Sequence, residues 1–267
     1  MNLATASYCF LGIFKRELHR FLQQRARFAS ALVRPLLWLL VFAAGFRAAL
    51  GIAIIPPYET YITYEVYITP GLVGIILLFN SMQSSLSMVY DREMGSMKVL
   101  LTSPMPRSYL LLCKILSTSL VSLLQVYTFL LIAALFDIVM PASGYFWLLP
   151  AVLLASLMLC SLGLLLSILI KQLENFAGVM NFVVFPMFFL SSALYPLWRM
   201  RESSEFIYLV CLYNPFTHAV ELIRFALYAS LNLPALGVTA AVTAVLLFAA
   251  ISAYQPRNRP QRGKPPS

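Results

Sequence analysis

Residues 90–114 read YDREMGSMKVLLTSPMPRSYLLLCK, a segment with six charged residues and two prolines. Apolar runs flank it at 67–89 and 115–136, and each is about as long as the ~20 residues that a helix needs to cross a bilayer. A charged, proline-broken segment between two such runs is typical of a loop at one membrane face. The sequence therefore predicts a membrane protein with a short loop at this position.

The composition of the whole chain supports the membrane class. Hydrophobic residues make up 61% of its 267 residues, charged residues only 11%, and the mean hydropathy is +0.83. A soluble domain usually contains about 25% charged residues. Segments that are apolar and long enough to cross a bilayer lie at 32–52, 68–90, 115–136, 146–170, 176–197 and 235–254. We therefore expect an all-α polytopic membrane protein, a single domain over 1–267 with six transmembrane helices.

The basic residues predict the orientation of these spans, because Lys and Arg are retained on the cytoplasmic side of short loops. With both termini cytoplasmic, 15 of the 19 Lys and Arg residues fall on that side, and the other four are Arg47, Arg199, Arg201 and Arg224. The loop at 91–114 and the tail at 255–267 are then cytoplasmic. This bias explains the net charge of +9 without a nucleic-acid partner.

The pattern of residues 1–31 predicts an amphipathic helix on the inner membrane surface. Apolar residues recur there at three- and four-residue steps, at Phe10, Leu11, Phe14, Leu18, Phe21 and Leu22. Basic residues fall largely on other faces of this helix. The alternative is a cleaved signal peptide, but basic residues continue to Arg34 and no short apolar region with a small-residue cleavage site follows.

Residues 198–234 are too amphipathic for a plain loop, and two short helices broken at Asn214-Pro215 fit them. Such a pair predicts a re-entrant helical hairpin that dips into the outer leaflet before the last span. Two surface helices at the membrane interface are the alternative. Glu221 and Arg224 lie on one face of the second helix, where a local ion pair is expected more than a ligand site.

The spans contain neutral polar residues but no charge near their centres. Those in the second and fifth spans are open to two interpretations, interhelical hydrogen bonding or a substrate path, and are Asn80, Gln83, Ser84 and Asn181. Phe185 and Phe189 accompany Asn181 in the fifth span. Because ion-coupled carriers usually keep a charge at membrane depth, a proton- or sodium-coupled carrier is disfavoured.

The sequence has no pattern for nucleotide binding. The phosphate-binding motif GxxxxGK[ST] does not occur, so we expect any ATP to be hydrolysed by another protein. The four cysteines form no CxxC pair, and His19 and His218 fall on opposite membrane faces by this topology. Neither a disulfide nor a metal site is therefore expected. The ten acidic residues are too dispersed for an intramembrane enzyme.

The loop and the hairpin resemble those of a known family. The loop is similar to the inner loop of type-2 ABC transporter permeases in its YDRE start at 90–93, Gly95-Ser96, the Leu pair at 100–101, Pro104, Arg107 and Lys114. The segments 186–196 and 214–224 look like the fifth span and the outer re-entrant helices of that family. The resemblance covers nearly the whole chain.

This resemblance implies a transport subunit of a bacterial inner membrane rather than an enzyme. Such a permease pairs with a second copy or with a similar permease, and it binds a separate ABC subunit that holds ATP and Mg. No cofactor is expected in this chain. The resemblance also implies a coupling helix that docks into the ATP-binding subunit through Asp91, Arg92, Glu93, Gly95, Ser96, Met97, Lys98, Leu101, Pro104 and Arg107.

The function implied is outward transport of an amphipathic or lipid-like substrate along a path between two copies. The second and fifth spans would line this path through Asn80, Gln83, Ser84, Asn181, Phe185 and Phe189. A polysaccharide or glycolipid exporter is the near alternative. From other classes, a stand-alone secondary carrier and a non-transporting membrane scaffold stay open.

Overall fold

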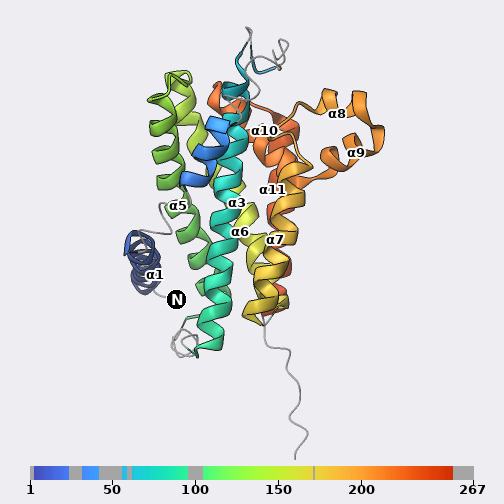
Figure 1. Cartoon of the computed structure of the whole chain (residues 1–267). Coiled ribbons are helices and arrows are strands. Elements are labelled where there is room, and N and C mark those ends of the chain that lie inside the picture. Colours follow the sequence, from blue (N-terminus) through green and yellow to red (C-terminus); the bar gives the residue numbers. More distant parts are fainter. Residues whose placement is uncertain are drawn as a thin grey trace, which may run out of the picture.

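The computed structural model describes residues 3–23, 32–41, 56–58, 62–95, 105–170 and 172–254. Helices dominate these residues, and in chain order they are α1 (Leu3–Gln23), the unlabelled helix Leu32–Val41, α3 (Tyr64–Glu93), α5 (Arg107–Ala134), α6 (Ala142–Leu169), α7 (Leu173–Phe189), α8 (Leu197–Ser203), α9 (Glu205–Tyr213), α10 (Pro215–Leu227) and α11 (Leu233–Tyr254). Figure 1 shows α3, α5, α6, α7 and α11 side by side in an upright bundle. We call the end where α3 stops and α5 starts the loop end, and the end with α8 and α9 the hairpin end.

The long helices are suited to a bilayer in both length and surface. Within the described part of the chain, α3, α5, α6 and α11 are each long and apolar enough to cross a membrane, and α9 and α10 together form a fifth candidate, bent by 73°. The surface of the bundle is apolar as well: Leu131, Val245 and Phe248 are 68%, 67% and 74% exposed. Such side chains are stable against lipid and would be a liability in water. The chain is therefore a multi-pass membrane protein.

The sequence predicted the positions of these four helices and misplaced several ends. The predicted segments 68–90 and 235–254 lie inside α3 and α11. The predicted segment 146–170 extends one residue beyond the end of α6. The third span begins at Arg107, eight residues before the predicted start at 115. The loop is therefore shorter than the predicted 91–114, because residues 91–93 still belong to α3 and 107–114 already belong to α5.

The prediction that the fifth span continues to residue 197 is wrong, since α7 ends at Phe189. Ser191 accounts for the ending. Its hydroxyl donates to the carbonyl of Phe188 and accepts the N–H of Ala193, so it offers the backbone an alternative to further helical turns. Of the predicted first span, only Leu32–Val41 is described, and residues 42–52 lie outside the described residues. The six-span count therefore stays a prediction.

The segment 198–234 contains three helices, where the sequence predicted two. The predicted break at Asn214-Pro215 is confirmed: Pro215 opens α10, where its missing N–H is not needed, and the Asn214 side chain accepts the N–H of Phe216. The Asn214 amide also donates to the carbonyls of Met187 and Leu190. One side chain thus caps α10 and ties it to the end of α7.

Glycines allow chain segments to approach one another closely towards the hairpin end of the bundle. A Cβ atom on Gly144 of α6 would lie 1.8 Å from the backbone oxygen of Leu227, and one on Gly71 of α3 would lie 2.3 Å from the backbone oxygen of Ala193. Because both neighbours are backbone atoms, neither contact can be relieved by a side-chain rotation. As in many membrane bundles, the smallest residues thus fix the positions of neighbouring segments.

We predict that Gly144→Ala destabilises the bundle by about 1–3 kcal/mol, the usual cost of overpacking a filled site. The measurement is the midpoint of thermal unfolding in mild detergent. Gly237→Ala in α11 is the matched control, because nothing lies within 4 Å of its added Cβ. Equal midpoints for the two variants would contradict the close α6–α10 contact.

Candidate functional site

The described part of the charged loop consists of two helix ends. Asp91, Arg92 and Glu93 form the last turn of α3, and Gly95 follows with φ +72°, a left-handed conformation that favours glycine and ends the helix. Arg107 begins α5 directly after Pro106. The other predicted docking residues, Ser96, Met97, Lys98, Leu101 and Pro104, lie outside the described residues.

Two ion pairs join these helix ends to α1. The Arg20 guanidinium lies 3.2 Å from the Asp91 carboxylate, and the Lys114 ammonium lies 3.5 Å from the Glu17 carboxylate. Glu17 and Arg20 are three residues apart, which places them on one face of α1. We call these four residues the ion-pair clamp. It holds the end of α3 and the beginning of α5 to the same helix.

The Glu17–Lys114 pair is buried. The two side chains are only 9% and 12% exposed, and Lys114 also lies 3.5 Å from the Ser87 hydroxyl. Burial alone would raise the pKa of Glu17, but the positive charges of Lys114 and Arg16 outweigh it and hold the pKa below its ordinary value. The carboxylate therefore stays charged at neutral pH, and it loses its charge as the pH falls through that lowered pKa. Removing one partner of a buried pair typically costs about 3–5 kcal/mol.

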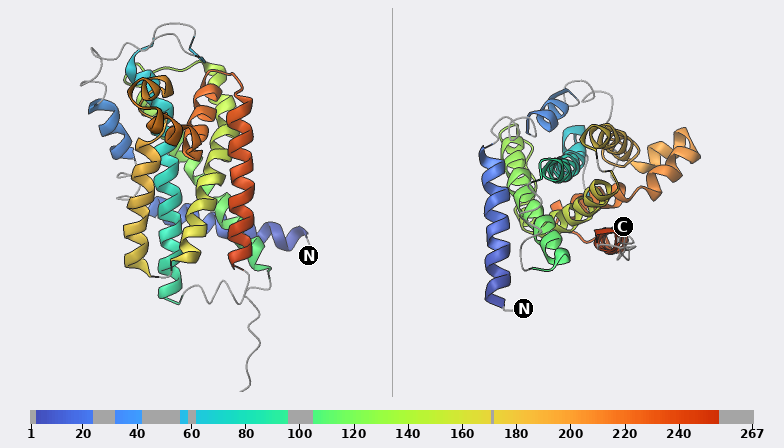
Figure 2. Two further views of the ribbon diagram at one scale, coloured as in Figure 1. Left: turned by 90° about the vertical axis from the view of Figure 1, so that its right-hand side faces the viewer. Right: turned by 90° about the horizontal axis from the view of Figure 1, so that it is seen from below.

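Apolar and polar contacts continue the docking of α1 along α5. Ile13 packs with Leu110 and Cys113, and the Tyr109 hydroxyl donates to the carbonyl of Ala6. Figure 2 shows the result: α1 lies crosswise beside the bundle rather than along it. The helix itself is confirmed over 3–23, and its place on the inner membrane surface stays a prediction. Its buried residues are Ala6, Ile13, Glu17 and Phe21, so the buried face is not wholly apolar, and residues 24–31 lie outside the described residues.

Glu93 makes a third link from the loop. Its carboxylate accepts a hydrogen bond of 2.9 Å from the backbone N–H of Leu173, the first residue of α7. The N-cap residue of α7, Gln172, provides no side-chain cap of its own. Glu93 therefore satisfies one of the unpaired N–H groups at this helix start and places a negative charge there, which the helix dipole favours.

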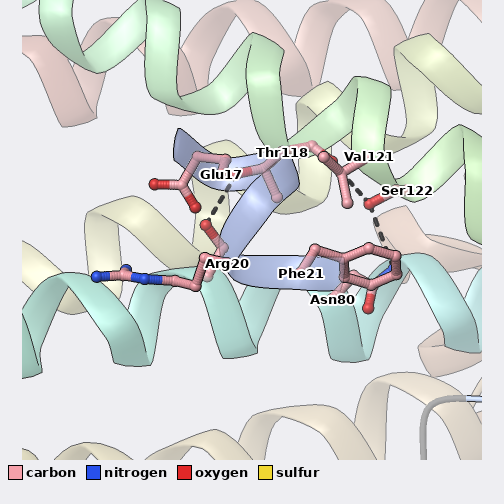
Figure 3. A pocket seen from close by; sticks show the side chains of 8 residues that line it. Glu17, Arg20, Phe21, Asn80, Thr118, Val121 and Ser122 are labelled. Carbon is pink, nitrogen blue, oxygen red and sulfur yellow. Dashed lines mark hydrogen bonds between the residues drawn. The ribbon is translucent and has the colours of Figure 1, made fainter. Parts of the chain in front are cut away.

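A seam of neutral polar side chains runs between α3 and α5 away from the clamp. Ser84 shares a hydrogen bond of 2.8 Å with Thr118, and Asn80 donates to Ser122 and to Gln125. These contacts agree with the interhelical interpretation of Asn80 and Ser84. Side chains of α1 also line a hollow of about 30 Å³ beside this seam, which has room for an ordered water. Figure 3 shows its lining residues, which are Glu17, Arg20, Phe21, Asn80, Ser84, Thr118, Val121 and Ser122.

The remaining predicted path residues lie elsewhere. Gln83 is half-buried on α3, whereas Asn181 is exposed on α7. The Phe185 and Phe189 rings stack at 6.2 Å and are 46% and 42% exposed. Helix α7 thus presents an aromatic face, next to a hollow of about 520 Å³ whose lining includes residues of α9. A substrate path through these residues stays a prediction.

The predicted hairpin pair is present, and it is more deeply embedded than expected. Arg224 is 4% exposed and pairs with Glu221 three residues earlier. It also donates a 2.7 Å hydrogen bond to the carbonyl of Ser192, and its guanidinium lies 4.1 Å from the centroid of the Tyr67 ring. This arginine therefore ties α10 to α3 and to the turn after α7, as an Arg over an aromatic face can do when it is desolvated.

Neither a metal cluster nor a disulfide is found in the part of the chain that the structure describes. The described functional features are a helical membrane bundle, a crosswise helix and charged helix ends held together by ion pairs. These define a multi-pass helical membrane protein with an ion-paired crosswise helix at one end of its bundle.

Residues 8–228 match the family model described as ABC-2 type transporter, and the chain belongs to this family. Its relatives include proteins named as candidate transport permeases, ycf38, from three algae. The chain is 28% identical to that of Cyanophora paradoxa over 83% of this chain and 76% of the relative, and 29% identical to that of Porphyra purpurea over 81% and 70%. The protein of Pyropia yezoensis is 28% identical over 78% and 69%. The protein is thus a membrane permease subunit, and permeases of this family typically work with an ATP-binding subunit.

We predict that Glu17→Gln loosens α1 from α5, because it removes the charge that Lys114 pairs with in a buried site. Cys113 reports this, since it is 3% exposed under α1. In a variant that keeps Cys113 as the only cysteine, maleimide labelling at neutral pH should become several-fold faster. Lys15→Gln, on the exposed face of α1, is the control and should label at the original rate. An unchanged rate in Glu17→Gln would mean that the clamp does not hold the helix.

Proposed function

We propose that this chain is the membrane subunit of an ATP-driven exporter, powered by a separate ABC subunit that binds ATP and Mg. The observation that carries the proposal is the set of three links from the helix segments that flank the loop. Asp91 and Lys114 are tied to α1, and Glu93 is tied to the start of α7. A protein that moves the loop therefore moves a surface helix and a helix with an exposed aromatic face together.

The coupling step would begin where a partner seats against the loop. Residues 91–107 would supply the docking surface, with the methionines as adaptable apolar contacts and the charges setting the register. A buried ion pair is a stiff connection, because separating the charges in a medium of low dielectric is costly. Displacement of the loop would thus be passed on to α1 and α7 rather than absorbed between them.

The distribution of basic residues supports an orientation in which the loop end and both termini would face the cytoplasm, and the membrane would be a bacterial inner membrane. The first of six spans would contain Leu32–Val41, and α3, α5, α6, α7 and α11 would be the others. Helices α9 and α10 would then form a re-entrant hairpin from the outer face. The 73° bend and the buried Arg224 support this, since a hairpin at membrane depth must have its polar groups covered by protein.

The substrate path would form between two permease chains, either two copies or this chain and a similar permease. The exposed aromatic face of α7 supports such a path, since Phe182 is 79% exposed and the stacked Phe185 and Phe189 lie beside it. An amphipathic or lipid-like substrate fits this face best. A polysaccharide or glycolipid is the second candidate, because sugar rings also stack on aromatic rings.

The first test is capture of an ATP-binding subunit. The chain, solubilised in mild detergent, is expected to co-purify with an ABC subunit from its own genome. A variant with residues 96–104 replaced by a Gly/Ser linker should lose this capture while keeping its thermal midpoint. Capture of the ABC subunit by both the original chain and the linker variant would refute loop docking. Capture by neither would favour the stand-alone carrier or the scaffold.

Variants of Glu93 distinguish its hydrogen bond within the chain from a contact with the partner subunit. We predict that Glu93→Ala keeps capture and lowers ATP hydrolysis by the complex in lipid nanodiscs by about 2–10-fold, as expected for a lost hydrogen bond of about 0.5–1.5 kcal/mol. Glu93→Gln should stay within about twofold of the original, because its amide oxygen can still accept the Leu173 N–H. Equal losses in both variants would indicate that the charge, and not the link to α7, matters.

A further inference from the structure

A groove at the hairpin end lies between α6, α10 and α11, apart from the clamp and from α7. Its volume is about 390 Å³, within the range of ligand pockets, and its lining is Trp147, Pro150, Ala151, Leu154, Leu222, Ala226, Ala229, Ser230, Leu231 and Leu236. The left view of Figure 2 shows the three helices next to one another, with α11 in red. Nothing in the proposed transport function uses this groove.

The groove lies between helices that are held at a fixed spacing by close contacts. Its floor is made by the small buried side chains of Ala151 and Ala226 together with Leu222. Just beyond it, Gly144 meets the backbone of Leu227, which fixes the spacing of α6 and α10. On the third side, the turn into α11 is held by two hydrogen bonds from Ser230 to the carbonyl of Phe225.

The chemistry of the walls selects an apolar occupant. Nearly all lining side chains are hydrocarbon, so a water molecule there would lack the polar partners that an internal water needs. The groove also opens onto the apolar outer surface of the protein, since two of its own lining residues, Trp147 and Leu231, are 55% and 66% exposed. In a bilayer, the molecule that meets this surface is a lipid chain.

The position of the groove along α6 places it in the hydrocarbon core, where acyl chains of phospholipids lie. Helix α6 has 28 residues and is about 42 Å long, so roughly four residues at each end project beyond a hydrocarbon core of about 30 Å. Trp147 then lies near the boundary, where tryptophans are typical, and Leu154 lies about 10 Å deeper. A chain that enters beside Trp147 would run along α6 towards Leu154.

We propose that this groove binds one acyl chain of a membrane phospholipid from the leaflet on the hairpin side, as a structural lipid. The acyl chain would pack between α10, α6 and α11 and stabilise their arrangement. Because α10 also carries Arg224, which links the hairpin to α3 through Tyr67, the lipid would stabilise the hairpin as a unit. This inference requires only that the chain lies in a membrane, so it stands or falls separately from the exporter function.

Native mass spectrometry of the protein exchanged into phosphatidylglycerol and mild detergent tests the proposal. The original chain should retain one phospholipid per chain, and Ala226→Leu and Ala151→Leu, which fill the groove, should each retain none. Ala244→Leu, on the exposed face of α11, is the matched control and should retain the lipid. Absence of a retained lipid in the original chain, or unchanged retention in both groove variants, would overturn the proposal.

Thermal unfolding distinguishes a variant that has lost lipid binding from a variant that is misfolded. Added phosphatidylglycerol should raise the midpoint of the original chain and of Ala244→Leu, and should raise that of Ala226→Leu much less. In detergent without lipid, Ala226→Leu should unfold no earlier than the original chain, because its added carbons occupy space that the lipid has left. Equal lipid effects in all three chains, or a groove variant that changes the oligomeric state without changing lipid retention, would identify a different occupant and refute the proposal.

Discussion

The buried ion pair between Glu17 and Lys114 is the interaction on which the arrangement at the loop end depends. A helix with several basic residues cannot cross the bilayer, and its docking to α5 buries a carboxylate that would be unstable there alone. Lys114 makes that burial possible because it pairs with the carboxylate. One turn further along α1, Arg20 forms a second ion pair, with Asp91 of α3. As a result, α1 is fixed crosswise at the point where the charged loop leaves and re-enters the bundle.

The hairpin end is organised by a different constraint, close backbone packing. Gly71 and Gly144 allow segments after α7 and in α10 to approach α3 and α6 at distances that a Cβ would forbid. Once these segments are so close, their polar groups need internal partners, and Asn214 and Arg224 supply them through the carbonyls of Met187, Leu190 and Ser192. A rigid hairpin and a charge-linked loop end thus occupy opposite ends of one bundle, with α3 and α7 between them.

The long helices could be predicted from the sequence because the length and polarity of a span are local properties of the chain. The end of α7 could not, since Ser191 and the contact of Gly71 with Ala193 act through particular geometry. The clamp joins residues that are 71 and 97 positions apart, and no local pattern reports such a pairing. One signal was available: Glu17 is the only acidic residue in the first 31. The apolar surroundings of Arg224 in α10 were a similar signal of its burial.

The central claim is that motion of the loop is passed to α1 and α7 through these links. Hydrogen–deuterium exchange of the permease bound to its ATP-binding subunit, with and without a non-hydrolysable ATP analogue, tests it most directly. The account predicts that nucleotide changes exchange in the loop, in α1 around residues 13–21 and in the first turn of α7 together. A change confined to residues 91–107 would contradict it.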